Sequence, residues 1–423
     1  MMLREGGRGL TSSRGQRLVR SALIVAQTAF ALVLLAAAGL MLQSFRNMRN
    51  VPPGFDRTDV LTAEISLPSA QYDTYEKVEA FYHLLLTRAA AIPGVRDAAL
   101  GSTVPLTASR SDAALNGFSG CATVTVEGHP LQPGEEAPCV AAPMAAPGYF
   151  RTLGIKVRGT EPSWSDIESR TGGVVVTQAL AKRLWPGQDP IGKGLKPGTY
   201  QPPYYHVVGV TNDFRGSSLD KPPTEAVFYP LLPLPKAGLW APRTSATILL
   251  RTNGVPPQTL AAPLRHLLTS LDPNVPLANV RTMDDVVAQS MVRLSFTMLL
   301  LGIAAAMALI LSAVGIYGVI SYIVGRRRSE IGIRMALGAQ ASRVGGLVVL
   351  QSLELAAVGV VIGIAGALAM TRVLQSVLFD VSSTDPTTLL SVSAIMLIIA
   401  GLASYVPAQR AMNVDPVEAL RAD

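Results

Sequence analysis

The sequence contains few charged residues, and they are unevenly distributed along the chain. Only 15% of its 423 residues are Asp, Glu, Lys or Arg, whereas a typical soluble domain carries about 25%. Four runs contain no charged residue: 21–45, 294–325, 355–371 and 386–409. A helix needs roughly 20 apolar residues to cross a bilayer core of about 30 Å. The third run reaches this length by extending toward Val344 through Glu354, so the chain is predicted to span a membrane four times.

The first run resembles a secretory signal in one respect, because Arg14, Arg17 and Arg20 precede it. Its apolar stretch exceeds the roughly 7–15 residues of a signal core, and no small-x-small cleavage pattern follows it. We therefore predict a retained anchor, with cleavage as the alternative.

Motifs of known catalytic sites are also missing. The four histidines are isolated, and no H-E-x-x-H, G-x-S-x-G or C-x-x-C occurs. Residues 187–194 read G-Q-D-P-I-G-K-G, one residue short of the phosphate-binding pattern G-x-x-x-x-G-K-[ST]. Gly194 offers no hydroxyl to magnesium, and Pro190 removes a backbone donor. We interpret the stretch as a Gly/Pro turn and predict neither an enzyme nor a metal or cofactor site in this chain.

Cysteine is as scarce as catalytic motifs, because Cys121 and Cys139 are the only two. Outside the cytoplasm this pair is able to form a disulfide that would stabilise the fold by about 3 kcal/mol. Two unpaired thiols are the alternative, since spacing alone does not decide between them.

Arginine positions predict the orientation. Arg4, Arg8, Arg14, Arg17 and Arg20 precede the first run, and five more arginines lie in 326–343. Positive residues accumulate in cytoplasmic loops. The net charge of +7 then marks orientation in the inner (cytoplasmic) membrane, not nucleic-acid binding. The predicted segments are a cytoplasmic 1–20, transmembrane helices 21–45, 294–325, 345–371 and 387–409, outer segments 46–293 and 372–386, a cytoplasmic loop 326–344 and a cytoplasmic tail 410–423.

The outer segment 46–293 has the pattern of an α+β domain with two lobes. Helical spacing of apolar residues predicts helices over 75–92, 178–185 and 256–271, and β-rich runs predict strands at 95–100, 173–177, 206–210 and 246–250. One lobe boundary is expected near Pro143–Tyr149, with the chain returning to the first lobe near Val286.

The loop after the second run reads G-R-R-R-S-E-I-G-I-R-M-A-L-G-A over 325–339. Its arginines, Arg326, Arg327 and Arg328 first, suit a simple positive-inside anchor. More than charge is present, however. Glu330 pairs with Arg334, and Ile331 with Met335, at i,i+4 spacing. This pattern predicts a short amphipathic helix on which a soluble partner is able to dock.

Two further features lie in the last two spans and the tail. Glu354 is an ionisable residue inside the third span, for which we favour a packing role over ion translocation, because no second buried charge is present. Gly359, Gly363 and Gly366 form a small-residue face that predicts close helix contact. In the tail, Asp415 and Pro416 are suited to start a last helical turn.

Together these segments resemble the MacB/FtsX-type ABC transporter permeases over nearly the whole chain. The similar stretches are G-R-R-R-S-E-I-G-I-R-M-A-L-G-A, the terminal P-A-Q-R-A-M-N-V-D-P-V-E-A-L-R, and, in the outer domain, P-G-Y-F-R-T-L-G-I (147–155) and L-W-P-G-Q-D-P-I-G-K (184–193). The resemblance implies four transmembrane helices, a MacB-like periplasmic core, a dimer and a separate cytoplasmic ATPase that binds the ATP. It also makes Glu330, Ile331, Arg334 and Met335 the expected coupling residues.

The first residues, R-E-G-G-R-G-L-T-S-S-R-G-Q-R-L-V-R, are similar to the internal junction of duplicated permeases. The second permease unit is therefore expected to be an identical copy or the other half of an eight-span protein. The alternative function is a membrane-anchored receptor or scaffold for envelope partners that works without an ATPase.

Overall fold

The computed structural model describes residues 14–107, 121–128, 136–169, 171–198, 204–231, 244–326, 340–370 and 385–412, with a few single residues between these ranges. Contacts within the chain divide it into two compact units. One unit holds residues 1–50 and 293–423, and the other holds residues 51–292. The first is helical, and the second contains the β-sheet.

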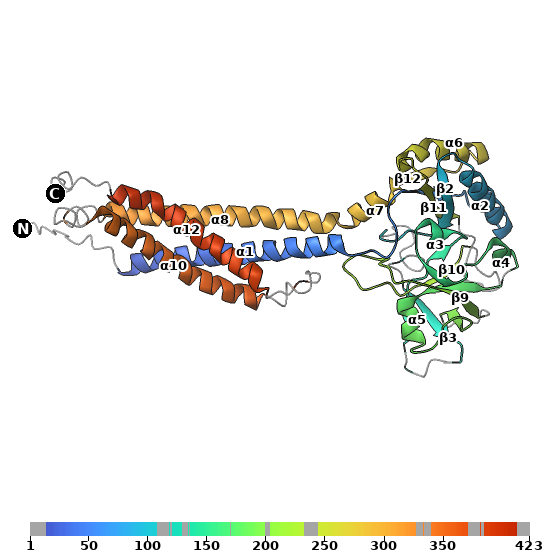
Figure 1. Ribbon diagram of the computed structural model, residues 1–423, viewed down its shortest axis with the longest axis horizontal. Helices are drawn as coiled ribbons and strands as arrows, with labels where there is room; N and C mark the ends of the chain where they lie inside the picture. The colour runs from blue at the N-terminus through green and yellow to red at the C-terminus, as the bar shows by residue number, and fades with distance from the viewer. Residues whose placement is uncertain are drawn as a thin grey trace, which may run out of the picture. The chain divides into compact units, whose positions relative to one another are not determined.

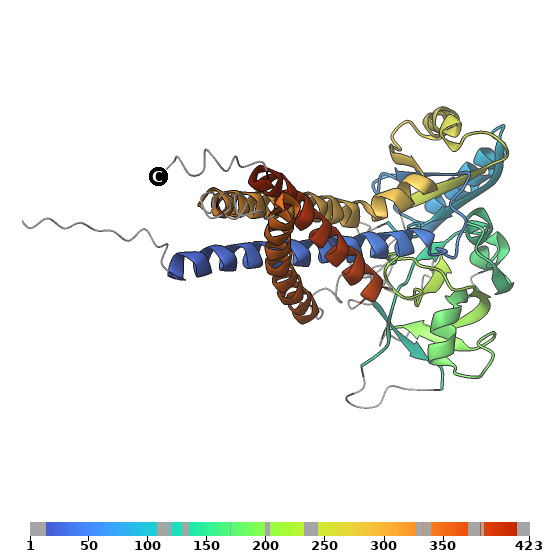
Figure 2. The ribbon, with the colours of Figure 1, turned by 60° about the vertical axis from the view of Figure 1, so that its left-hand side comes forward.

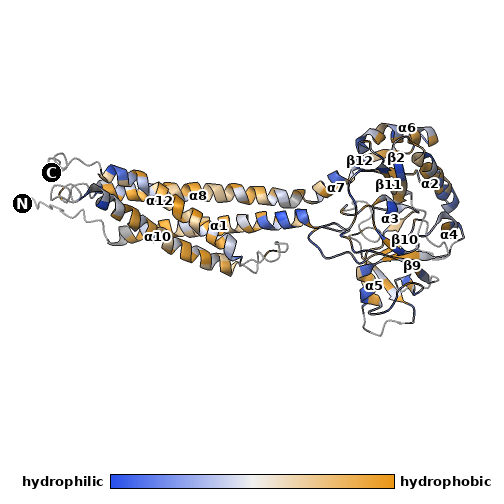
Figure 3. Cartoon of the chain, viewed as in Figure 1, coloured by the Kyte–Doolittle hydropathy of each residue, from blue (hydrophilic) through white to orange (hydrophobic). Residues whose placement is uncertain are grey.

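The helical unit contains four long helices among its described residues: α1 (Arg14–Asn50), α8 (Val292–Arg326), α10 (Ala341–Ala369) and α12 (Pro386–Met412). Figure 1 shows them gathered in one bundle, and in Figure 2 α12 crosses obliquely over α1. All four are long and apolar enough to cross a membrane. Hydrophobic residues cover most of their length in Figure 3. The four predicted spans are therefore present as helices.

Two of these helices are longer than a membrane requires. At 1.5 Å per residue, the 37 residues of α1 and the 35 residues of α8 extend about 55 and 52 Å, against a bilayer core of about 30 Å. The part of α1 that is longer than the bilayer core includes residues 46–50. The sequence pattern predicts these residues to belong to the outer domain. Figure 3 shows hydrophilic residues at this end of α1, as expected for a helix that continues beyond the apolar layer.

The second unit is built on a mixed sheet with the strand order β12-β1-β11-β2-β5-β10-β7-β9-β8-β3-β4, and β6 pairs with β9. Its first lobe comprises β1 (Val60–Ser66), β2 (Val95–Gly101), β5 (Met144–Ala145), β11 (Ser245–Thr252) and β12 (Leu277–Thr282). Its second lobe comprises β3 (Ala122–Val126), β4 (Cys139–Val140), β6 (Val157–Gly159), β7 (Gly173–Thr177), β8 (Gly194–Pro197), β9 (Tyr205–Thr211) and β10 (Val227–Pro230). β5 and β10 pair in parallel and join the two lobes.

Three helices of the second unit lie where the hydrophobic spacing predicts them: α2 (Tyr75–Ala90), α5 (Gln178–Leu184) and α6 (Ala261–Leu271, preceded by the 3-10 turn Pro257–Leu260). Three shorter helices were not predicted: α3 (Tyr149–Thr152), α4 (Trp164–Glu168) and α7 (Met283–Ser290). Val78 and Leu85 of α2 and Leu264 of α6 are fully buried, in one core with Leu61 and Ile248 of the sheet. The α+β prediction for this segment is confirmed.

One predicted boundary is wrong. The sequence placed the return to the first lobe near Val286, but β11 at Ser245–Thr252 already lies there, between β1 and β2. The prediction failed because strand pairing is non-local. The apolar pattern of 246–250 identifies a strand, but it does not reveal which strands lie beside it.

Candidate functional site in the helix bundle and the α+β unit

A glycine seam holds the third span against the first. A Cβ added to Gly359 would lie 2.7 Å from Cβ of Thr28, and one added to Gly363 would lie 3.0 Å from the carbonyl oxygen of Ala29. The contact at Gly366 is less close, since a Cβ added there would lie 3.4 Å from Cγ2 of Val33. Small residues allow helix backbones to approach this closely. The three glycines that the sequence singled out thus form the contact between α10 and α1.

Polar side chains connect the other helices to α1. The hydroxyls of Thr28 and Ser312 of α8 are 3.4 Å apart and buried. The Thr388 hydroxyl of α12 donates to the side-chain oxygen of Gln43 at 3.3 Å. Hydrogen bonds of this kind keep polar atoms satisfied where no water is available. α1 is therefore the helix that the other three share.

Glu354 is exposed on α10, on a different face from Gly359 and Gly363, and forms no hydrogen bond or ion pair with the described residues. Its packing role stays a prediction, because contacts within one chain do not show what a second permease unit covers.

α8 carries an apolar stripe that the rest of the bundle leaves uncovered. Its members recur every three or four residues and are each at least half exposed: Phe296, Leu299, Leu300, Ile303, Met307, Ile310, Leu311 and Val314. The opposite side of the helix packs inward through Ser312, Ile316 and Ile320. The stripe faces either lipid or another protein chain.

Most of the predicted coupling loop lies outside the described residues. Arg327, Arg328, Glu330, Ile331, Arg334 and Met335 all belong to that part, as does the tail from Asn413. Arg326, the last residue of α8, is described, and its guanidinium lies 5.9 Å from the centre of the Tyr322 ring. The helix that leads into the loop is thus in place.

A buried arginine holds the segment that contains Asp56, near the start of the second unit. Arg251 of β11 is 4% exposed and donates to the Asp56 carboxylate at 2.8 Å and to the carbonyl oxygen of Thr152 at 2.8 Å. Burial by itself raises the pKa of Asp56, but hydrogen bonds from Thr58 and Arg251 outweigh it and hold the pKa below its ordinary value. The sequence analysis missed this pair.

The segment that contains Asp56 is attached to the second lobe as well. The Asn212 amide donates to the carbonyl oxygen of Gly54 at 3.0 Å, and the backbone N–H of Arg215 donates to that of Pro53 at 2.8 Å. Gly54 has φ of +85°, and a Cβ at this position would lie 2.4 Å from a backbone oxygen, so only glycine fits. Residues 53–56, which follow α1 in the chain, are therefore hydrogen-bonded to both lobes.

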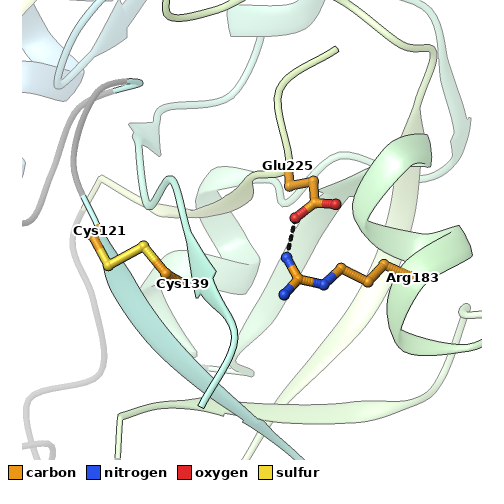
Figure 4. The surroundings of a disulfide bond; sticks show 4 residues. All are labelled: Cys121, Cys139, Arg183 and Glu225. Carbon is orange, nitrogen blue, oxygen red and sulfur yellow. Dashed lines mark hydrogen bonds and ion pairs between the residues drawn. A yellow bond between two sulfur atoms is a disulfide. The ribbon is translucent and has the colours of Figure 1, made fainter. Parts of the chain in front are cut away.

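The two cysteines form a disulfide in the structure. Their spacing in the sequence did not decide between a disulfide and two free thiols. Cys121 and Cys139 link the start of β3 to β4 (Figure 4), and the two Cα atoms are 5.1 Å apart. Figure 4 also shows Arg183 of α5 paired with Glu225, which precedes β10. Both links lie in the second lobe.

The two outer-domain stretches that resemble the family, 147–155 and 184–193, take part in hydrogen bonds that hold the second unit together. In 147–155, the hydroxyl of buried Tyr149 donates to the carbonyl oxygen of Thr103 at 2.9 Å. In the turn 187–194, three backbone N–H groups are used internally: Gln188 donates to Trp185, Lys193 to Pro190 and Gly192 to Val207. A phosphate cradle needs such groups free, so the Gly/Pro-turn interpretation fits the geometry.

No group of three or more His, Cys, Asp or Glu side chains is placed to hold a metal ion within the described part of the chain. Its arrangement is that of a helical unit and an α+β unit in one chain.

Comparison with known proteins agrees with this arrangement. Residues 21–267 match the family description "MacB-like periplasmic core domain", and residues 302–416 match "FtsX-like permease C-terminal". The macrolide export ATP-binding/permease protein MacB of Agrobacterium fabrum is 26% identical over 65% of this chain and 42% of its own length. The pyoverdine export ATP-binding/permease protein PvdT of Pseudomonas syringae pv. syringae is 28% identical over 63% of this chain and 40% of its own.

The solved periplasmic region of MacB from Actinobacillus actinomycetemcomitans aligns with 58% of this chain and 95% of its own length, at 12% identity and a TM-score of 0.37. That likeness is too low to identify a fold by itself. The chain spans about two fifths of the length of the curated relatives it matches. The periplasmic-core match alone covers more than half of the present chain, from Ser21 to Leu267. The chain therefore belongs to the MacB/FtsX-type ABC transporter permease family.

Proposed function

We propose that the chain is the permease subunit of an ABC transporter. A separate cytoplasmic ATPase binds the ATP, docks on the loop after α8 and drives movement of the periplasmic-type domain, which exports or extracts an envelope substrate. The observation that carries the proposal is the pair of family matches, 21–267 and 302–416. The curated relatives are named ATP-binding/permease proteins, and this chain matches about two fifths of their length.

The geometry of α8 supports a mechanical role. This helix runs without a break from Val292 to Arg326 and adjoins the predicted docking loop at one end. At its other end, Met291 separates it from α7, whose start is closed by a capping box of Thr282 and Asp285. A continuous helix transmits displacement along its axis better than a flexible linker does.

The exposed stripe of α8 supports a dimer. Apolar residues at intervals of three and four form a seam of the kind that packs against a second helix. We infer that a second permease unit, a copy of this chain or the other half of a duplicated protein, covers this stripe.

Co-purification tests the ATPase assignment. The tagged full-length chain, extracted from its native membrane in mild detergent, is expected to retain an ABC ATPase, identified by mass spectrometry and by ATP hydrolysis. The double substitution Glu330→Ala/Arg334→Ala should reduce the retained ATPase roughly tenfold or more, as expected when a few interface contacts carry the binding.

The matched control is Glu76→Ala/Arg88→Ala, an exposed pair on α2, which should leave ATPase capture unchanged. If the unaltered chain retains envelope proteins but no ATPase, the receptor or scaffold function replaces the permease proposal. If both double variants lose the ATPase equally, the loop is not the docking site.

A further inference from the structure

A cavity of about 560 Å³ lies in the second lobe beside the turn 187–194. β6, α5 and the end of β9 form its other walls. Ligand-binding pockets in proteins commonly have volumes of about 300–1,000 Å³. The cavity belongs to one compact unit and has no role in the coupling proposed above.

The charged side chains that line this cavity are all basic: Lys156, Arg158 and Lys182. Arg158 is already occupied, because its guanidinium donates to both carboxylate oxygens of Asp189, at 3.1 and 3.3 Å. The Lys182 ammonium is 3.9 Å from the Asp213 carboxylate, a long and exposed pairing. Lys156 forms no ion pair with the described residues. Lys156 is thus available to an anion, and Lys182 is held only by the long pairing with Asp213.

Neutral groups add polar and apolar surface to the same cavity. Gln178 and Gln188 contribute amides, and Trp185, 3% exposed, contributes part of its ring. Thr211 also lines the cavity, is 1% exposed, and its hydroxyl has no hydrogen-bond partner among the described residues. Buried hydroxyls are usually paired, so this one marks a polar position that the rest of the chain does not fill.

We propose that this cavity binds a ligand through a phosphate group, carried by a free organophosphate or by a phospholipid headgroup. Arg is the side chain that best fits the two oxygens of a carboxylate, and Arg158 is already engaged in that way by Asp189. The cations that remain are lysines, which bind phosphate as point charges. Gln178 and Gln188, which also line the cavity, supply amide groups, a type of side chain that is able to donate hydrogen bonds to phosphate oxygens.

Calorimetric titration of the purified full-length chain in a neutral detergent tests the proposal. The probes are glycerol 3-phosphate, a dihexanoyl phosphatidylglycerol below its micelle concentration, and glycerol as the phosphate-free control. At low salt, at least one phosphate compound is expected to bind and glycerol is not. Binding of glycerol 3-phosphate would indicate the free organophosphate as the source, and binding of the lipid alone would indicate the headgroup.

The discriminating variant is Lys156→Gln/Lys182→Gln, which should weaken that binding roughly tenfold or more, because charge-assisted hydrogen bonds are lost. Both lysines are exposed, so the fold is expected to survive, which thermal unfolding verifies. Lys77→Gln/Lys221→Gln makes the same charge change at exposed positions outside the cavity and should bind like the unaltered chain. The proposal is overturned if no phosphate compound binds, or if both double variants bind equally. The assay contains no ATPase, so its result is independent of the coupling proposal.

Discussion

Arg251 and Asp56 are 195 residues apart in the chain, and the arginine donates a 2.8 Å hydrogen bond to the aspartate near the start of the second unit. Arg251 is almost fully buried, whereas the Asp56 side chain is 47% exposed. The same guanidinium donates to the carbonyl oxygen of Thr152. One side chain therefore fastens the strand β11, the segment 53–56 and the helix α3 together.

Replacing Arg251 by alanine is expected to lower the free energy of unfolding by about 2–3 kcal/mol, because buried acceptors lose their donor and the packed side chain is lost. The half-exposed carboxylate keeps access to water, which limits the cost. The matched control is Arg57→Ala, whose pairing with Asp284 is exposed on both sides and should cost about 0.5 kcal/mol or less. Thermal unfolding in detergent compares the two, and equal losses would contradict the stabilising role of buried Arg251.

Acid should destabilise the domain through its paired aspartates. Hydrogen bonds from the Thr282 hydroxyl and backbone lower the pKa of Asp285, and those from Ser163 lower the pKa of Asp166. A depressed pKa means that the folded state prefers the ionised carboxylate. The stabilisation is then complete above the ordinary value of 3.8 and is lost as the pH falls through the folded-state pKa.

The predicted pH profile is flat from about pH 7 to 5 and falls below about pH 4, the range in which ordinary aspartates become protonated. Urea unfolding followed at several pH values measures it. Asp285→Asn should be less stable near pH 7 and should show a shallower acid slope. If the free energy of unfolding changes with pH by the same amount in the variant and in the unaltered chain, this capping box does not contribute to acid sensitivity.

The spans and the glycine face were open to prediction from sequence because their signals are local. Twenty apolar residues identify a span, and Gly359 and Gly363 are one helical turn apart. The Arg251–Asp56 pair gave no such signal, since its members are remote in sequence and nothing near either residue specifies the other. The basic cavity was missed for the same reason. Lys156 and Lys182 come from different elements, and only the folded sheet brings them to one place.

A larger side chain in the glycine seam between α10 and α1 should destabilise the helix bundle. A Cβ at Gly359 would be 2.7 Å from Thr28, so Gly359→Ala requires the two helices to move apart. We expect a loss of about 1–3 kcal/mol, which is usual for overpacking. Gly346→Ala on the same helix is the control, because no atom lies within 4 Å of its added Cβ. Alanine has the higher helix propensity, so Gly346→Ala should leave the unfolding temperature unchanged or raise it slightly. Equal lowering in both variants would show that the close contact at Gly359 is not responsible.

Cysteines on the exposed stripe of α8 should cross-link two permease units. Ile303→Cys and Ile310→Cys, each introduced in a chain lacking Cys121 and Cys139, are expected to give a disulfide-linked dimer in native membranes under mild oxidation. Ile316→Cys, buried against Ile24 on the inward side of α8, should give none. Non-reducing gels measure the outcome. Dimers formed equally at all three positions would point to random collision.

Thiol labelling in spheroplasts tests the orientation. The disulfide of Cys121 and Cys139 persists in an oxidising compartment and is rare in the cytosol, so both thiols should resist an impermeant maleimide until an impermeant phosphine reduces them. Arg343→Cys, introduced in a chain without the native cysteines, marks the start of α10, where arginine-rich sequence predicts the cytoplasmic side. It should react only after lysis. Labelling of this cysteine in intact spheroplasts would place the domain and the loop on the opposite sides of the membrane from those proposed, and an ATPase in the cytosol would have no loop on which to act.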